Sequence, residues 1–222
     1  GKGCQKCGGR GVLRDSVESA LESAAKQSFG ASGATLHATG REDIDVLMLG
    51  NGRPFVLEVH SPKTRQGAIA RFADDVNSSG QVELSGSARQ VGIEFIELVC
   101  NSHFEKEYDA LVAAGRPLTD SDCRLLSGKT IILRQQTPSR VLRRRSDLLR
   151  TRTVRILRAS IAQGGLIRLH ILAEAGSYIK EFINSDTGRT KPSISEMLSC
   201  TAQCKELNVV KIHDGFIRTC GI

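Results

Sequence analysis

The chain has 222 residues, of which 40% are hydrophobic and 25% charged, the balance of an ordinary globular protein rather than a disordered one. No apolar run is long enough to cross a membrane, and no apolar leader follows the first residue. We therefore expect an intracellular protein with no membrane partner. The seven cysteines, an odd number, fit reduced thiols in such a compartment.

Positive charge is unevenly distributed along the chain. The net charge is +7, from 31 Lys and Arg against 24 Asp and Glu. Between residues 134 and 158 a single acidic residue, Asp147, accompanies Arg134, Arg140, Arg143, Arg144, Arg145, Arg150, Arg152, Arg155 and Arg158. Guanidinium groups suit bidentate phosphate contacts, so the segment predicts a nucleic acid partner, although a solvated surface strand is the alternative. If residues 151–158 form a strand, Arg152 and Arg158 share a face that Arg155 does not.

The N-terminal part of the sequence predicts one helix followed by an extended stretch. Residues 1–14 are glycine-rich and are expected to be a linker or the remnant of a preceding domain. Asp15 and Glu18 form a D-x-x-E capping box, and apolar side chains then recur at helical spacing as far as Phe29. Residues 35–39 follow as an extended stretch.

The next segments are expected to alternate between strands and one helix. Asn51-Gly52 separates two β-rich runs, residues 44–49 and 55–59, and this arrangement predicts a hairpin. Residues 61–90 are polar, with scattered Gly and Ser, and predict a helix with a loop. Residues 91–99 alternate well enough to predict a strand.

The C-terminal half predicts mainly strands. After residues 106–110, which lead into a short polar region, strands are expected at 130–134, 151–158, 167–171 and 209–212. A helix is expected to begin at Tyr178, and a capping box of Ser193 and Glu196 predicts another as far as about Lys205. Many strands interrupted by a few helices indicate an α+β fold with a mostly antiparallel sheet.

Three short motifs follow one another along the chain. They are Arg41-x-Asp43, Lys106-x-Tyr108-x-Ala110 and Gly176-Ser177-Tyr178-Ile179-Lys180. An isolated R-x-D is more often a local ion pair or a turn cap than a catalytic site. In this order, however, the motifs resemble the three core motifs of pseudouridine synthases.

Longer blocks extend the resemblance to one family. Residues 40–55, 136–145 and 175–193 resemble the signature blocks of the Pus-ten family of archaea and eukaryotes, which modifies the TΨC arm of tRNA. The resemblance runs from about residue 15 to residue 213. It implies a pseudouridine synthase fold, with a mixed, mostly antiparallel sheet flanked by helices, and a catalytic domain at 15–222.

The same resemblance implies the activity and the partners. The expected reaction is the isomerisation of uridine to pseudouridine at position 54, position 55 or both, with tRNA as substrate and no cofactor. Full-length members of the family carry an N-terminal THUMP-like accessory domain with a cysteine zinc site, and we expect a monomer.

The chemistry needs a carboxylate close to C1′ of the ribose or C6 of the base. The resemblance implies that Asp43 is this nucleophile. Asp45 would share its face in an extended chain, so alternation alone does not separate the two, and only the spacing from Arg41 favours Asp43. Lys180 occupies the basic position of the third motif and is expected to stabilise the carboxylate; its alternative is a surface lysine.

The resemblance also implies three residues that bind the target nucleotide. The chain has two tyrosines and no tryptophan, and both tyrosines fall inside the motifs. Tyr108 is expected to stack on the target uracil and Tyr178 to line the pocket, although Tyr178 could equally be a core aromatic. Arg41 is expected to fill the space that the flipped uridine leaves, with an ion pair to Glu42 or Asp45 as the alternative.

Five arginines are expected to contact the RNA backbone: Arg140, Arg143, Arg144, Arg145 and Arg189. Cys4 and Cys7 resemble half of a chaperone zinc module and are a weak metal candidate, since tetrahedral zinc needs four ligands. Cys200 and Cys204 lie one helical turn apart and are expected to be ordinary helix residues. Two rival interpretations therefore remain, a non-catalytic RNA-binding module and a zinc-dependent module.

Overall fold

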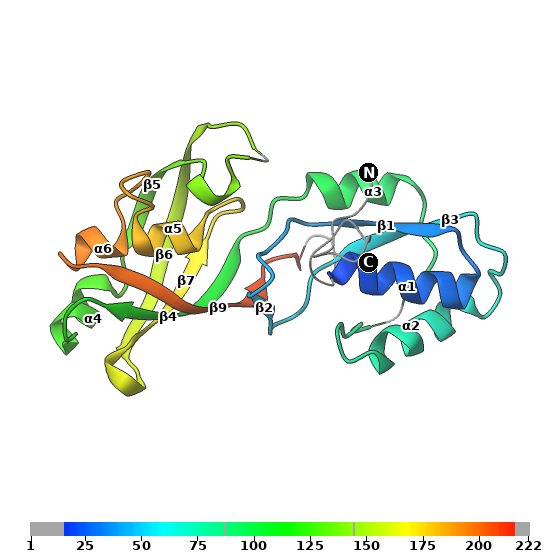
Figure 1. The fold of residues 1–222 in the computed structure, drawn as a ribbon, viewed down its shortest axis with the longest axis horizontal. Coiled ribbons are helices and arrows are strands. Elements are labelled where there is room, and N and C mark those ends of the chain that lie inside the picture. Colours follow the sequence, from blue (N-terminus) through cyan, green and yellow to red (C-terminus); the bar gives the residue numbers. More distant parts are fainter. Residues whose placement is uncertain (1–15, 87, 144, 216–222) are drawn as a thin grey trace, which may run out of the picture. The chain divides into compact units, whose positions relative to one another are not determined.

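The computed structural model describes residues 16–86, 88–143 and 145–215. The chain divides into two compact units (Figure 1). Unit 1 comprises the residues up to Thr39 together with Pro54–Ser102, and unit 2 comprises Gly40–Arg53 and the residues from His103 onward. The expected domain boundary at residue 14 and the predicted contribution of Asp15 to a capping box lie outside the described residues.

Unit 1 is built on helices and a two-stranded sheet. Its elements are α1 (Val17–Phe29), β1 (Gly33–Ala38), β3 (Phe55–His60), α2 (Ala68–Ser78) and α3 (Glu94–Asn101). The core lies between α1 and α2, where Leu21 and Val76 are each 1% exposed and the rings of Phe29 and Phe72 lie 5.9 Å apart. The first helix begins after Ser16, whose side chain forms a reciprocal capping box with Ser19, one residue later than predicted.

Unit 2 contains a seven-stranded sheet with the order β2-β9-β4-β7-β6-β5-β8. Its strands are β2 (Leu47–Met48), β4 (Lys106–Ala114), β5 (Thr130–Gln136), β6 (Leu149–Ile161), β7 (Ile167–Ala173), β8 (Thr190–Lys191) and β9 (Ala202–Ile212). All neighbouring strands are antiparallel except β2 and β9, which are parallel. The predicted α+β class with a mostly antiparallel sheet is confirmed.

Helices cover one face of this sheet (Figure 1). They are α4 (Asp120–Leu126), α5 (Ile179–Asn184) and α6 (Ile194–Met197), and two 3₁₀ turns, η2 (Ser139–Val141) and η3 (Gln163–Gly165), lie in the connections. Alternate strand side chains and the apolar side chains of α4 and α5 form one core, in which Phe182 is fully buried. The opposite face carries cross-strand ion pairs such as Arg168 with Asp109.

The predicted hairpin at residues 44–59 is wrong, because its two strands belong to different units. Leu47 and Met48 pair with β9, and β3 pairs with β1. Asn51 does not form a turn between them; its side-chain amide donates to the Ile212 carbonyl and accepts from the Ile212 amide, both at 2.8 Å. Gly50 allows this close approach, since a Cβ there would lie 1.9 Å from the Val210 carbonyl oxygen.

Two other predicted elements are also wrong. The segment 91–99 is not a strand, because helix α3 covers most of it and spaces Phe95, Leu98 and Val99 onto one partly buried side. The helix from Ser193 begins with the predicted capping box but ends at Met197. Residues from Ala202 onward extend to pair with β4 along its whole length, so backbone hydrogen bonds to a distant strand replace the expected helical turns.

Candidate active site

The three motifs converge within unit 2. Arg41 and Asp43 lie on the loop before β2, Lys106 and Tyr108 begin the interior strand β4, and Tyr178 is the N-cap of α5, which contains Lys180. The polar atoms of the loop and of α5 come into direct contact, although they are about 135 residues apart in the sequence, as for Asp45 and Lys180. The sequence motifs therefore form one site.

Asp43 lies between two cations. Its Oδ1 accepts a hydrogen bond from the Arg140 guanidinium at 2.7 Å, and its Oδ2 lies 3.3 Å from the Lys180 ammonium. The Asp43 side chain is 35% exposed, so the carboxylate remains open on one side. Two cationic groups therefore contact the carboxylate that the resemblance assigns as the nucleophile.

Lys180 has a second and closer partner. Its ammonium lies 2.7 Å from both carboxylate oxygens of Asp45, whose side chain is 66% exposed. The hydrogen bond from Lys180 lowers the pKa of Asp45. Burial alone would lower the pKa of Lys180, but the hydrogen bonds and charges of Asp45 and Asp43 raise it. Lys180 is therefore shared between the two aspartates rather than dedicated to Asp43.

Arg140 is held from behind by a buried carboxylate. Its Nε donates to Oε1 of Glu181 at 2.7 Å, and the Glu181 side chain is only 5% exposed. Burial alone would lower the pKa of Arg140. The hydrogen bonds and charges of Glu181 and Asp43 have a larger effect and raise this pKa. Charges therefore alternate along the chain of contacts from Asp45 through Lys180, Asp43 and Arg140 to Glu181.

A second ion cluster anchors the loop that carries Asp43. Oε1 of Glu42 accepts from Lys106 at 2.7 Å and from Arg53 at 2.8 Å, and none of the three side chains is more than 19% exposed. Gly40 makes room for it, with a left-handed φ of +89° and a Cβ position 3.2 Å from the Lys106 ammonium. The lysine of the second motif thus binds the residue beside the aspartate of the first.

The two tyrosines occupy different environments. Tyr108 is 5% exposed and belongs to the core, and burial, together with the nearby charge of Glu42, raises its pKa. Tyr178 is half-buried, and its hydroxyl accepts from Arg145 at 3.5 Å. The buried amide of Gln135 holds the Tyr178 backbone, since it accepts from its N–H and donates to its carbonyl, both at 3.0 Å.

The predicted arginines differ in what they contact. Arg41 and Arg143 are exposed, and both alternative partners of Arg41 are engaged elsewhere, Glu42 by Lys106 and Asp45 by Lys180. Arg144 lies outside the described residues, as do Cys4 and Cys7.

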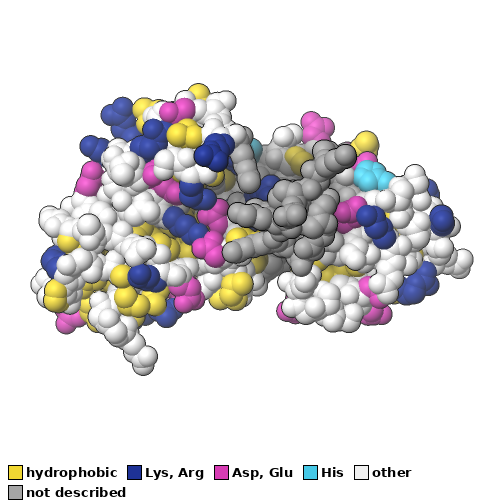
Figure 2. Space-filling view, viewed as in Figure 1, with side chains coloured by type: hydrophobic (Ala, Val, Ile, Leu, Met, Phe, Trp, Pro, Cys, Tyr) yellow, Lys and Arg dark blue, Asp and Glu magenta, His cyan; other side chains and the backbone are white. Residues whose placement is uncertain are grey.

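Arg189 connects two parts of the protein rather than pointing freely outward. Its guanidinium donates to the Thr137 carbonyl at 2.8 Å and to Asp147 at 2.5 Å, so it fixes both ends of the segment between β5 and β6. The expected contact of Arg189 with RNA stays a prediction. In Figure 2 Lys and Arg side chains gather over this part of unit 2.

The predicted faces of the β6 arginines are wrong. Arg152 pairs with the buried Leu133 and lies on the helix-covered face, whereas Arg155 and Arg158 pair with Leu172 and His170 on the opposite face. The register shifts between Ile156 and Arg158, so the strand carries an extra residue there. Such a bulge reverses the alternation of every following side chain.

The described residues contain no group of three or more His, Cys, Asp or Glu side chains that could hold a metal. Cys200 and Cys204 do not lie on one helix as expected, because Cys200 follows α6 and Cys204 lies in β9. No helix among the described residues has the length and apolarity of a membrane span.

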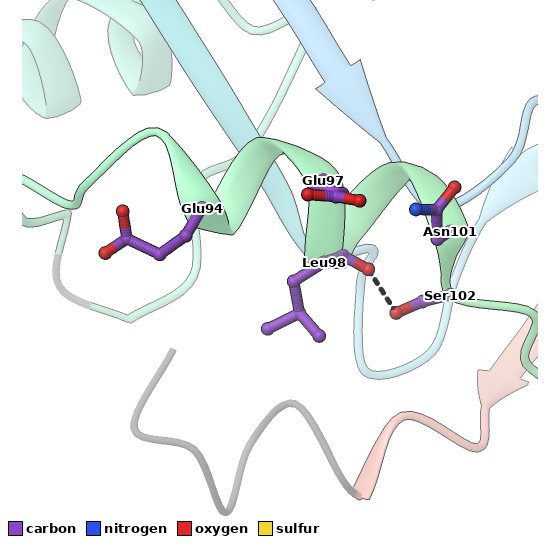
Figure 3. Close-up of a pocket in the computed structure, with 5 residues that line it drawn as sticks. All are labelled: Glu94, Glu97, Leu98, Asn101 and Ser102. Carbon is purple, nitrogen blue, oxygen red and sulfur yellow. Dashed lines mark hydrogen bonds between the residues drawn. The ribbon is translucent and has the colours of Figure 1, made fainter.

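A hollow of about 330 Å³ lies on α3 in unit 1, whereas the motif residues belong to unit 2 (Figure 3). It is lined by Glu94, Glu97, Leu98, Asn101 and Ser102, and the Ser102 hydroxyl donates to the Leu98 carbonyl at 2.6 Å. Among the described residues that line it, two are glutamates and none is cationic, unlike a surface that binds RNA phosphates.

Three residues of the site were not predicted from the sequence. Glu181, Glu42 and Gln135 each lie within a block that resembles the family or directly beside one, but as single polar residues they carry no spacing signal. Their charges or amide groups matter only because the fold buries them beside distant partners.

Comparisons with known proteins identify the family of this chain. The family model described as "Pus10, C-terminal" matches residues 4–213. "tRNA pseudouridine synthase Pus10" of Methanocaldococcus jannaschii is 40% identical over 220 residues, covering 96% of this chain and 48% of the relative. The protein of the same name from Thermoplasma acidophilum is 40% identical over 215 residues, covering 90% of this chain and 52% of the relative.

Among solved structures, a chain of a Cbf5-Nop10-Gar1 complex aligns with a TM-score of 0.45 and 18% identity, covering 86% of this chain and 44% of that one. The chain spans about half the length of the curated relatives it matches. Because the family model covers nearly the whole chain, the expected family is confirmed: this chain belongs to the Pus10 C-terminal family.

Proposed function

We propose that this chain catalyses the isomerisation of uridine to pseudouridine in tRNA, in the TΨC arm at position 54, position 55 or both. The observation that carries the proposal is the position of Asp43, whose carboxylate lies between Arg140 and Lys180 where the three motifs converge. Both archaeal relatives are named as tRNA pseudouridine synthases, which supports the same substrate class for this chain.

The proposed nucleophile is Asp43. Its carboxylate oxygen attacks C1′ of the ribose or C6 of the base, and the C1′–N1 bond breaks. The uracil rotates, C5 bonds to C1′, and the bond between Asp43 and C1′ or C6 breaks, which regenerates the carboxylate. The proton leaves C5, and N1 gains a proton. The atoms of uridine are conserved, so the reaction consumes no oxidant, reductant or second substrate.

The surrounding residues have supporting roles in this proposal. Arg140 and Lys180 stabilise the charge on Asp43 before attack and as the carboxylate is regenerated. Tyr178 lies at the N-terminus of the helix that carries Lys180 and lines the pocket. The stacking of Tyr108 on the base stays a prediction, and this residue is 5% exposed. Arg41 is exposed on the loop that carries Asp43, so its side chain is accessible to the RNA.

We assign RNA-backbone binding to two exposed arginines of the β5–β6 segment, Arg143 and Arg145, and to Arg144, which lies between them in sequence. Exposed guanidinium groups release counterions when they bind phosphate, which gives affinity without base specificity. A THUMP-like domain in the full-length protein, a monomeric state and an intracellular location stay predictions.

The experiment that tests the proposed function is incubation of the chain with an unmodified tRNA transcript, followed by mapping of pseudouridine. We expect pseudouridine in the TΨC arm with the wild-type chain. Asp43→Asn should lower the rate by at least about 1,000-fold, while its affinity for tRNA stays within about threefold of the wild-type affinity. Asp45→Asn should slow the reaction by about tenfold at most, because it removes only a partner of Lys180.

The matched control is Asp109→Asn, on the opposite face of the sheet, which should not change the rate. An Asp43→Asn protein that turns over near the wild-type rate would exclude Asp43 as the nucleophile. A wild-type chain that binds tRNA but forms no pseudouridine would instead favour the non-catalytic RNA-binding module.

A further inference from the structure

The arginine-rich composition of residues 134–158 predicts that Arg140 is one of several arginines that contact the RNA backbone. Its contacts in the structure differ from those of the other arginines. One edge of its guanidinium, Nε with NH2, faces Glu181 at 2.7 and 3.5 Å, and NH1 donates to Asp43 at 2.7 Å. Both edges of the planar fork are therefore engaged by carboxylates of the protein itself.

The partner behind Arg140 is well fixed. Glu181 is 4% exposed and lies in α5 directly after Lys180. A buried carboxylate is costly unless a cation with matching geometry binds it, and a bidentate guanidinium has that geometry. Glu181 thus fixes the position of the Arg140 guanidinium, and Arg140 in turn holds Asp43, whose side chain lies on a loop and is 35% exposed.

Lys180 cannot replace Arg140 in orienting the Asp43 carboxylate. It is the family's basic residue by resemblance, yet its ammonium lies 2.7 Å from both oxygens of Asp45 and 3.3 Å from Asp43. The shorter contact to Asp43 comes from Arg140. An ammonium is a point charge, whereas a guanidinium binds two carboxylates in one plane and so fixes an orientation.

We propose that Arg140 is a catalytic residue of this site, which orients the Asp43 carboxylate and stabilises its charge, and that Glu181 is a positioning residue acting through Arg140. The inference rests on the proposed function. It replaces the RNA-backbone role of Arg140, because a guanidinium with both edges occupied has little capacity left for phosphate.

The test compares Arg140→Lys and Arg140→Gln in the full chain, with an unmodified tRNA transcript, under single-turnover conditions at saturating protein. We expect Arg140→Gln to lower the rate of pseudouridine formation by about 100-fold, and Arg140→Lys by at least tenfold, because lysine keeps the charge but cannot bridge both carboxylates. The dissociation constant for tRNA and its dependence on salt should stay within about twofold.

Arg143→Gln and Arg143→Lys are the matched controls from the same segment. Arg143 is exposed, so Arg143→Gln should weaken tRNA binding and reduce the log–log slope of its salt dependence by about one unit. Arg143→Lys should keep the tRNA affinity and the salt slope of the wild-type chain. If the Arg140 variants instead behave like the Arg143 variants, with weakened binding, rescue by lysine and an unchanged saturated rate, the inference is overturned.

A double-mutant cycle separates positioning by Glu181 from a merely structural role. Glu181→Gln should lower the rate about tenfold in the wild-type chain but less than threefold in the Arg140→Lys background, because its effect passes through Arg140. Equal losses in both backgrounds would overturn the positioning role. If Glu181→Gln does not fold, as judged by its circular dichroism, Glu181→Asp enters the cycle with the same expectation.

The outcomes also distinguish the inference from the proposed function. An active wild-type chain, an inactive Asp43→Asn variant and a fully active Arg140→Gln variant would overturn only the role of Arg140. A wild-type chain that forms no pseudouridine would overturn the proposed function and this inference with it.

Discussion

The ion cluster around Glu42 predicts how strongly the loop that carries Asp43 is held. Glu42→Gln leaves the charges of Lys106 and Arg53 facing each other across a neutral amide, with side-chain exposures of only 9% and 14%. Removing one partner of a buried ion pair costs about 3–5 kcal/mol, and the partial exposure of these side chains makes the expected cost smaller here. We expect Glu42→Gln to lower the free energy of unfolding of unit 2 by about 2–4 kcal/mol.

Lys106→Met should cost less than Glu42→Gln. Methionine fills the space of the lysine stem, and Glu42 keeps its 2.8 Å contact with Arg53, so no charge is left without a partner. A hydrogen bond to a charged group contributes about 1.5–3 kcal/mol, and the gain in apolar packing offsets part of it. The expected loss is about 1–2 kcal/mol.

Tyrosine fluorescence during urea unfolding measures this effect selectively. The chain has no tryptophan, and both tyrosines, Tyr108 and Tyr178, lie in unit 2. Lys205→Met, at an exposed position of β9, is the control and should change stability by less than about 0.5 kcal/mol. A Lys106→Met variant less stable than Glu42→Gln, or losses below about 0.5 kcal/mol for both, would refute the anchoring role of Glu42.

Two further predictions concern titratable groups. Hydrogen bonds from Arg116 and from Thr119 hold the pKa of Asp122 well below its usual range. A depressed folded-state pKa contributes stability above the unfolded-state pKa and loses it as the pH falls, so the difference in melting temperature between wild type and Asp122→Asn should be largest near pH 7 and shrink below about pH 4; a pH-independent difference would contradict this. Burial raises the pKa of Cys204 to about 11, so at pH 8 iodoacetamide should alkylate the exposed Cys100 well before Cys204, with the difference lost in urea; equal rates in the folded protein would contradict the burial.

The sequence by itself determined the features that depend on local pattern. The strands at 130–136 and 167–173 alternate apolar and polar side chains because one face of each is buried, and Ser193 with Glu196 forms the predicted capping box. The motifs around Asp43, Tyr108 and Lys180 could also be identified from the sequence, because each is a short run of residues with fixed spacing.

Pairing between distant segments was decided only by the tertiary structure. Asn51-Gly52 has the local pattern of a hairpin turn, yet the Asn51 amide binds the end of β9, 161 residues away. The bulge in β6 changes which arginines share a face, and no local periodicity reports where a strand gains an unpaired residue.

The electrostatics of the site were likewise decided by the tertiary structure. Composition placed Arg140 in a basic segment, and resemblance placed Lys180 beside Asp43, but the contact that brings Arg140 to Asp43 spans 97 residues. An ion pair depends on distance and burial, and neither is encoded in residue spacing along the chain. Because α5 buries Glu181 where Arg140 can reach it, one arginine among nine in its segment contacts the aspartate, although its side chain is still 39% exposed.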